Sequence, residues 1–278
     1  MNDDRTIVEK RDIVFASRTV TKIWEEVPSP ANPYLADCCR CHGYDILELA
    51  ASRSFPETIF LLFQGELPTR PQAELFETLM VGLINPGPRH PATRAAMNAG
   101  VGKTSPVHIL PIGLTVLGGS VNGGEEVEAA MRFIRKNSAN DPAVLVAELM
   151  DSAGESGDGD LHVAPGFGSH FGGIDPMPAG LADLLLGLPG SGNALAWGSD
   201  VARLLADHNQ GWRTTGIAAA VFCDLGFLPR VGIGLFQLLC APGLLAHGME
   251  LYPKPIHAMP FLDKEHYVIA EEARTRKR

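Results

Sequence analysis

The sequence predicts an all-α fold, and three observations support that class. Apolar residues recur at helical spacing over most of the chain, Pro, Gly and polar capping residues interrupt them at regular intervals, and alternating β patterns are scarce. We expect helices over 46–50, 55–62, 72–83, 92–101, 105–117, 125–136, 181–186, 194–209, 216–225 and 229–247.

The local signals at helix ends agree with this expectation. Thr69 is placed as an N-cap, with Pro71 in the first turn of the helix that follows. The helix opened by Glu125 carries acidic groups at its start and Arg135 and Lys136 near its end, the arrangement that the helix dipole favours.

Composition and charge restrict the class of function. The 278 residues are 45% hydrophobic and 20% charged, the balance of a globular protein, and the net charge of -9 argues against a nucleic-acid surface. The first twenty residues contain no apolar core of signal-peptide length. The apolar stretches 109–117 and 231–245 are broken by Pro and Gly, so we expect buried helices and no membrane association.

The cysteines indicate a reducing compartment. Five cysteines form an odd set without the spacing of a disulfide framework, so we expect a cytoplasmic protein. Cys38, Cys39, Cys41 and His42 are crowded together, but a second ligand pair at a standard distance is absent, so we expect no bound metal.

A polar, Gly-rich run at 151–160 is a candidate hinge. It suggests an N-terminal extension over 1–30, the first part of a large helical domain over 31–150, a hinge with a small lobe over 151–212, and the rest of the large domain with a C-terminal tail over 213–278.

Five motifs occur in the order found in citrate synthases and citryl-CoA lyases. They are 41–50 with 61–69, the Gly-rich segment 118–124, segment 165–168 followed by Asp175-Pro176, segment 216–227, and segment 242–247. Over roughly residues 38 to 250 the chain therefore resembles the citrate synthase superfamily, closest to its short citryl-CoA lyase branch. The resemblance implies a large helical domain with a smaller helical lobe, a homodimer, and coenzyme A as part of the substrate or product.

Family members form or break a carbon–carbon bond next to a CoA thioester, which requires a base and donors for an enolate oxygen. At the family's two histidines this chain has Asn122, then Ser169 followed by His170, and Thr215 stands at the position of the catalytic Asp. Cys240 stands where the family has an arginine of the last helix.

A second family arginine, which follows an Asp-Pro pair, is replaced by Met177. These arginines clamp the carboxylates of citrate, so the resemblance implies a substrate less anionic than citrate. It also implies a catalytic set of Asn122, Ser169, His170 and Thr215, a CoA-binding segment of Pro165, Gly166, Phe167 and Gly168, and substrate contacts from Gly123, Arg213 and Cys240.

Each candidate residue also has a structural interpretation. Asn122 and Thr215 are suitable helix N-caps, and His170 is a candidate loop histidine. Arg213 suits a surface ion pair, and Cys240 is a small apolar core residue.

Three functions remain open from the sequence. The leading one is an acyl-CoA carbon–carbon lyase or acyltransferase. The others are a catalytically silent CoA-binding or regulatory homologue, which the missing base and clamps predict, and an acyl-CoA hydrolase in which a loop histidine activates water.

Overall fold

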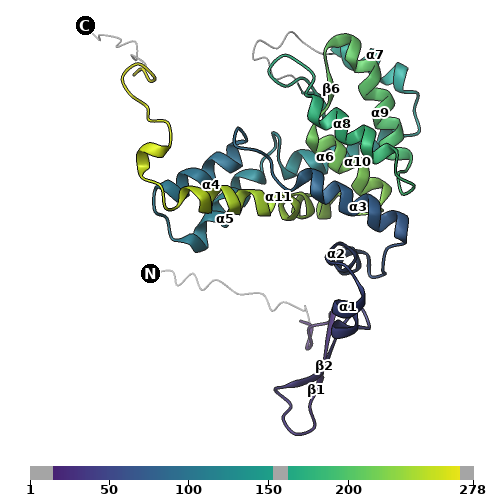
Figure 1. The fold of residues 1–278 in the computed structure, drawn as a ribbon. Coiled ribbons are helices and arrows are strands. Elements are labelled where there is room, and N and C mark those ends of the chain that lie inside the picture. Colours follow the sequence, from purple (N-terminus) through teal and green to yellow (C-terminus); the bar gives the residue numbers. More distant parts are fainter. Residues whose placement is uncertain (1–14, 153–161, 270–278) are drawn as a thin grey trace, which may run out of the picture. The chain divides into compact units, whose positions relative to one another are not determined.

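The computed structural model describes residues 15–152 and 162–269, so most of the predicted hinge at 151–160 lies outside the described residues. The chain divides into two compact units, Met1–Leu67 and Pro68–Arg278. Figure 1 shows the strands and helices of each unit in sequence colours. The domain boundaries predicted at 30, 150 and 212 stay predictions.

The N-terminal unit combines an antiparallel sheet of order β1-β2-β3 with two helices. Asp45 caps the first helix by accepting from the Leu47 and Glu48 amides, and Ser54 forms a capping box with Glu57 at the second. The elements of this unit are β1 (Trp24–Pro28), β2 (Ala36–Cys41), β3 (Tyr44–Asp45), α1 (Ile46–Ser52) and α2 (Phe55–Gln64).

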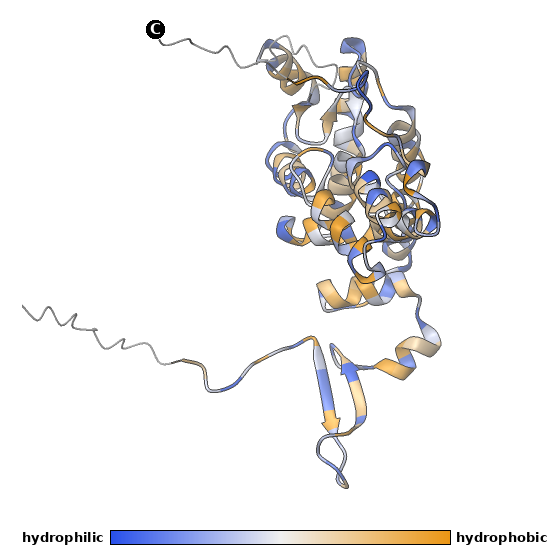
Figure 2. Cartoon of the chain, turned by 90° about the vertical axis from the view of Figure 1, so that its left-hand side faces the viewer, coloured by the Kyte–Doolittle hydropathy of each residue, from blue (hydrophilic) through white to orange (hydrophobic). Residues whose placement is uncertain are grey.

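The C-terminal unit is mainly helical and carries a second, very small antiparallel sheet of order β4-β5-β6. Hydropathy colouring shows hydrophobic residues along the helices, interspersed with hydrophilic ones (Figure 2). The helices are α3 (Arg70–Leu83), α4 (Pro91–Val101), α5 (Pro106–Leu117), α6 (Gly124–Asn137), α7 (Pro142–Ser152), α8 (Pro176–Leu186), α9 (Asn193–Leu205), α10 (Thr214–Asp224) and α11 (Pro229–Leu251). The strands are β4 (His162–Ala164), β5 (Phe167–Gly168) and β6 (Gly211–Trp212), and single 3₁₀ turns lie at Ala206–His208 and Ile256–Ala258.

Helix α10 lies at the centre of this unit. It is apolar on all sides, every residue from position 215 to 222 is buried, and it contacts α6, α9 and α3. Helix α11 is long and apolar enough to span a membrane by length and composition, but it packs against α4, α5 and α6. The stretch 231–245 is therefore part of a core helix, as predicted.

The all-α class is confirmed, and the predicted helices are present. Sequence reasoning missed α7 and both sheets. Only Leu145 and Val146 of α7 are buried, and its apolar residues do not gather on one face. The strands β3, β5 and β6 are two residues long, too short for an alternating pattern.

The β5–β6 pair brings two distant segments together, because Phe167 faces Trp212 in the ladder with ring centroids 4.6 Å apart. Beside it, Gly166 adopts a φ of +83° and packs on Gly216 of α10, where a Cβ on Gly166 would lie 2.5 Å from the Gly216 Cα atom. This close approach fixes where segments 165–170 and 213–215 meet.

Candidate functional site

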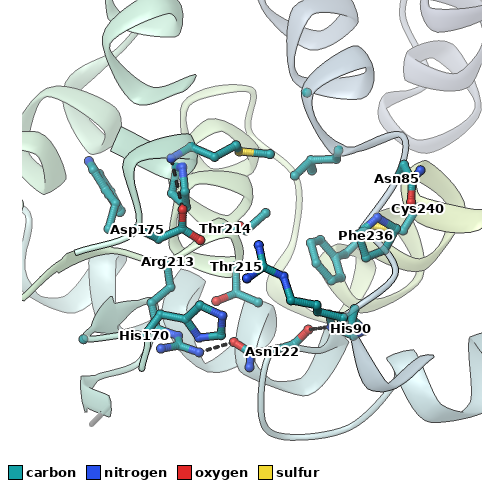
Figure 3. A pocket seen from close by; sticks show the side chains of 18 of the residues that line it. Asn85, His90, Asn122, His170, Asp175, Arg213, Thr214, Thr215, Phe236 and Cys240 are labelled. Atoms are coloured by element: carbon teal, nitrogen blue, oxygen red, sulfur yellow. Dashed lines mark hydrogen bonds between the residues drawn. The ribbon is translucent and has the colours of Figure 1, made fainter. Parts of the chain in front are cut away.

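A pocket of about 350 Å³ in the C-terminal unit collects most of the predicted site residues. It lies where the start of α10 meets the loop before α6, the segment after β5, the start of α8 and one side of α11 (Figure 3). Among its lining residues are Asn85, Arg89, His90, Asn122, Gly168, Ser169, His170, Asp175, Met177, Arg213, Thr215, Phe236 and Cys240. Gly123, Pro165, Gly166 and Phe167 do not line it.

Asn122 has a left-handed backbone conformation with a φ of 56°, which asparagine tolerates, and three of its polar groups are hydrogen-bonded. Its amide donates to the Glu126 Oε2 atom at 2.6 Å, and its carbonyl accepts from the His90 Nε2 atom at 3.0 Å. Its side-chain oxygen accepts from the Arg213 Nη2 atom, as Figure 3 marks. Because a guanidinium only donates, the Asn122 oxygen must face Arg213, so the Nδ2 group is the part left for a ligand.

Asn122 is not a helix N-cap. Helix α6 begins at Gly124, and Gly123 is the capping residue, with an extended backbone. A Cβ on Gly123 would lie 2.4 Å from the Gly119 carbonyl oxygen, so a tight turn explains this glycine. Its predicted substrate contact stays a prediction.

Glu126, in the first turn of α6, is 4% exposed and joins the segments of the site. Its carboxylate accepts from the Asn122 amide and from the Gly166 amide at 3.4 Å, and it lies 3.1 Å from the His162 Nδ1 atom. Burial acts to raise the pKa of Glu126, but His162, the Asn122 amide and the charge of Arg213 outweigh it, so the pKa lies below its ordinary value.

Arg213 is a buried residue of the pocket lining. It is 6% exposed, so the predicted surface ion pair is wrong; the partner charge is the buried Glu126, at 3.9 Å between Nε and Oε1. The Nη1 group donates to the Ser169 carbonyl at 2.5 Å, and Nη2 donates to Asn122. These contacts hold the guanidinium within the chain, and its role as a carboxylate clamp stays a prediction.

Thr215 is not an N-cap either, because α10 begins at Thr214 and Arg213 is its capping residue. Thr215 lies in the first turn, 1% exposed, and lines the pocket. Its hydroxyl oxygen has no hydrogen-bond partner among the described residues. Leaving a buried hydroxyl unsatisfied costs about 1–3 kcal/mol, so this group favours a polar ligand atom in the pocket.

Two histidines lie at the site. His90 caps α4, with Nδ1 accepting from the Ala92 amide at 3.1 Å, while Nε2 donates to the Asn122 carbonyl. Burial lowers the pKa of His90, and the nearby His170 lowers it further. His170 lines the pocket after β5, and its ring centroid lies 4.3 Å from that of Phe171.

The predicted CoA segment is mostly packed into the protein. Phe167 is fully buried against Trp212, and only Gly168 of the four residues reaches the pocket. The glycine at 166 is explained by its contact with Gly216. CoA binding by segment 165–168 stays a prediction.

The side of the pocket away from His170 is more apolar than the side with the hydrogen-bonded polar groups. Figure 3 shows Asn85, Phe236 and Cys240 away from His170. Cys240 is 2% exposed, and burial raises the pKa of its thiol to about 12, so it is a neutral apolar group at physiological pH.

Sequence reasoning missed Arg89, His90, Glu126, His162 and Asp175. Arg89 and His90 follow a Pro-Gly turn, and Glu126 was interpreted only through the helix dipole. Their common signal is a polar residue next to a glycine motif, which by itself is weak. In the parts of the chain that the structure describes, no group of three or more His, Cys, Asp or Glu side chains is arranged to hold a metal ion.

The comparisons with known proteins agree with the geometry. A family model described as citrate synthase, C-terminal domain, matches residues 36–155. The structure of citryl-CoA lyase from Hydrogenobacter thermophilus is similar, with 26% identity and a TM-score of 0.74 over 93% of this chain and 96% of that chain.

More distant structures share the fold. ATP citrate lyase from Methanothrix soehngenii has 17% identity and a TM-score of 0.68, and this chain covers 44% of it while 93% of this chain is matched. Citrate synthase from Thermotoga maritima has 14% identity and a TM-score of 0.52 over 94% of this chain and 96% of that chain. No curated protein sequence matches the chain.

The chain thus has a citrate synthase-like helical fold. Its predicted resemblance to the citrate synthase superfamily is confirmed, with citryl-CoA lyase among its most similar solved structures.

Proposed function

We propose that the chain is an enzyme that forms or cleaves a carbon–carbon bond next to the carbonyl of a CoA thioester, with a partner less anionic than citrate. The observation that carries this proposal is the side-chain amide of Asn122, which Arg213 orients at the wall of a pocket in a citrate synthase-like fold. A donor fixed before the substrate arrives stabilises charge without reorganising during the reaction.

The polar groups of the pocket suit an enolate. The Nδ2 group of Asn122 would donate to the thioester oxygen as its negative charge develops, and His170 or Ser169 would polarise the carbonyl of the partner. The buried Thr215 hydroxyl would donate to a second substrate oxygen, which would satisfy its own hydrogen bond.

The charges of the pocket favour a partner with a single carboxylate. Arg213 is matched by Glu126, whereas Met177, Phe236 and Cys240 are apolar or neutral. Arg89 is the one other arginine among the described lining residues, and it is exposed. One cation suits one carboxylate, and three carboxylates would leave two uncompensated.

The relatives support coenzyme A as the activating group. The citryl-CoA lyase relative is named for a CoA thioester, and the ATP citrate lyase structure contains citrate and coenzyme A. For this chain, coenzyme A is proposed as part of the substrate or product, in a cytoplasmic setting.

A homodimer is also proposed. Exposed apolar side chains occur on α5 at Val107 and Val116, and on α11 at Leu238, Leu245 and Met249. Leu238, Leu245 and Met249 share one face of α11, and an exposed apolar helix face suits a second copy of the chain. Light scattering after size exclusion would give twice the mass of the chain, and a monomer at micromolar concentration would contradict the dimer.

The test is a panel of thioesters followed by free thiol and product mass: citryl-CoA, acetyl-CoA with oxaloacetate, and acetyl-CoA and propionyl-CoA each with pyruvate. We expect carbon–carbon bond formation with pyruvate to exceed that with oxaloacetate. CoA binding without turnover would instead identify a silent homologue, and thiol release without a condensed product would identify a hydrolase.

A further inference from the structure

Asp175 is the only carboxylic acid among the described residues that line the pocket. It is the N-cap of α8, with an extended backbone, and one carboxylate oxygen accepts from the Met177 amide at 3.0 Å. That bond fixes the side chain and uses one oxygen, Oδ1. The other oxygen, Oδ2, has no hydrogen bond within the described part of the chain. Figure 3 shows Asp175 at the pocket, on the side away from Phe236 and Cys240.

Three other polar groups at the site are less suited to act as the base. The Nδ1 lone pair of His90 accepts from the Ala92 amide, and its Nε2 group donates, so the neutral ring has no lone pair left. Thr215 is a hydroxyl, which is not a base for a carbon acid at neutral pH. Glu126 accepts from Asn122 and Gly166 and does not line the pocket.

We propose that Asp175 is the base that removes the α proton of the thioester, a proposal that rests on the function proposed above. The carboxylate takes the proton, the C–H electron pair becomes the enolate, and Asn122 donates to the enolate oxygen. The enolate carbon then attacks the carbonyl carbon of the partner, and the partner's oxygen accepts a proton from His170. Cleavage runs the same steps in reverse.

This assignment moves the base from α10 to the start of α8. Thr215 stands where the family has its catalytic Asp, so the carboxylate of that position is missing. Asp175 lines the same pocket and supplies a carboxylate that can act as a base. Asp175 then touches the substrate, whereas Glu126 acts only through Asn122 and Arg213.

Asp175→Asn is a closely matched substitution, because asparagine caps a helix as well as aspartate does and only the basicity is lost. Asp183→Asn, on the exposed face of the same helix, is the control. The readout is exchange of the α hydrogens of acetyl-CoA and propionyl-CoA with deuterated water, with and without pyruvate, measured by mass spectrometry. Calorimetric titration with the same thioesters measures binding separately.

We expect Asp175→Asn to slow exchange by about 10²–10⁴-fold with thioester binding retained, while Asp183→Asn matches the wild type. Asp175→Glu should recover part of the rate. Exchange that survives Asp175→Asn but is lost in His170→Asn overturns the assignment and leaves the proposed function standing. A wild-type protein that exchanges neither thioester overturns the proposed function, and the assignment with it.

Discussion

Two groups of residues at the site use their polar atoms differently. The framework is a set whose members bond to one another: Glu126, Ser169 and Arg213 are buried, and Asn122 and His162 are half-buried. The open wall comprises the pocket residues outside this framework that are apolar or keep polar atoms without a hydrogen-bond partner among the described residues: Arg89, Asp175, Met177, Phe236 and Cys240. The framework therefore orients groups, and the open wall is left to select and transform the substrate.

Removing the Glu126 carboxylate should have the largest effect on stability. Glu126→Ala leaves the Arg213 charge buried without its counter-ion, and we expect a loss of about 3–5 kcal/mol in the free energy of unfolding. Urea denaturation measures it. The neighbouring Glu125 is exposed, so Glu125→Ala should change stability by no more than about 0.5 kcal/mol. Equal effects of the two substitutions would show that the framework does not depend on this ion pair.

Changing the Asn122 amide should have the next largest effect, and on catalysis. Asn122→Asp keeps an oxygen facing Arg213 and tolerates the left-handed backbone, but it replaces the Nδ2 donor by a negative oxygen. We expect kcat to fall about 10²–10³-fold for the best thioester of the panel, because an oxyanion donor is lost. As a control, the free energy of unfolding of the Asn122→Asp variant should equal that of the wild type. An unchanged kcat would contradict the role of Asn122 as the donor to the enolate oxygen.

The fold was predictable because its main signals are local. Helix starts such as those before Phe55 and Arg70 carry capping residues and prolines, and the structure places helices there. The small strands were not predictable, since β6 pairs with β5, Trp212 opposite Phe167, across more than forty residues. Pairing of this kind leaves no periodic signal in either segment.

The candidate site was partly predictable. Asn122, His170 and Thr215 were found through the motifs around them, and all three line the pocket. Their capping interpretations were wrong for Asn122 and Thr215, because each helix begins one or two residues from the expected position. Glu126 was missed as a partner, since its importance depends on a contact with Arg213 that sequence separation hides.

A substitution of Arg89 in the open wall should have a smaller effect, and on substrate binding. If this exposed arginine binds the single carboxylate of the partner, Arg89→Met should raise the KM for pyruvate about 10- to 100-fold, the value of a lost charged hydrogen bond. The KM for the thioester should change little. Arg70, at the start of α3 and outside the pocket lining, is a control, and Arg70→Met should leave both constants unchanged. An equal effect on the two substrates would argue against carboxylate recognition.

The smallest expected effect is the pH dependence caused by His90, which lines the pocket and donates to the Asn122 carbonyl. Burial lowers the pKa of His90 in the folded protein below the ordinary value of about 6.5 in the unfolded chain. The unfolded state therefore binds more protons just below that value, so the free energy of unfolding should fall as the pH is lowered from about 7 towards 5. His90→Asn keeps an oxygen to cap α4 and should flatten this decrease, measured by urea denaturation across the range. The exposed His257→Asn should retain the wild-type slope, and a His90→Asn slope equal to both would show that another group is responsible.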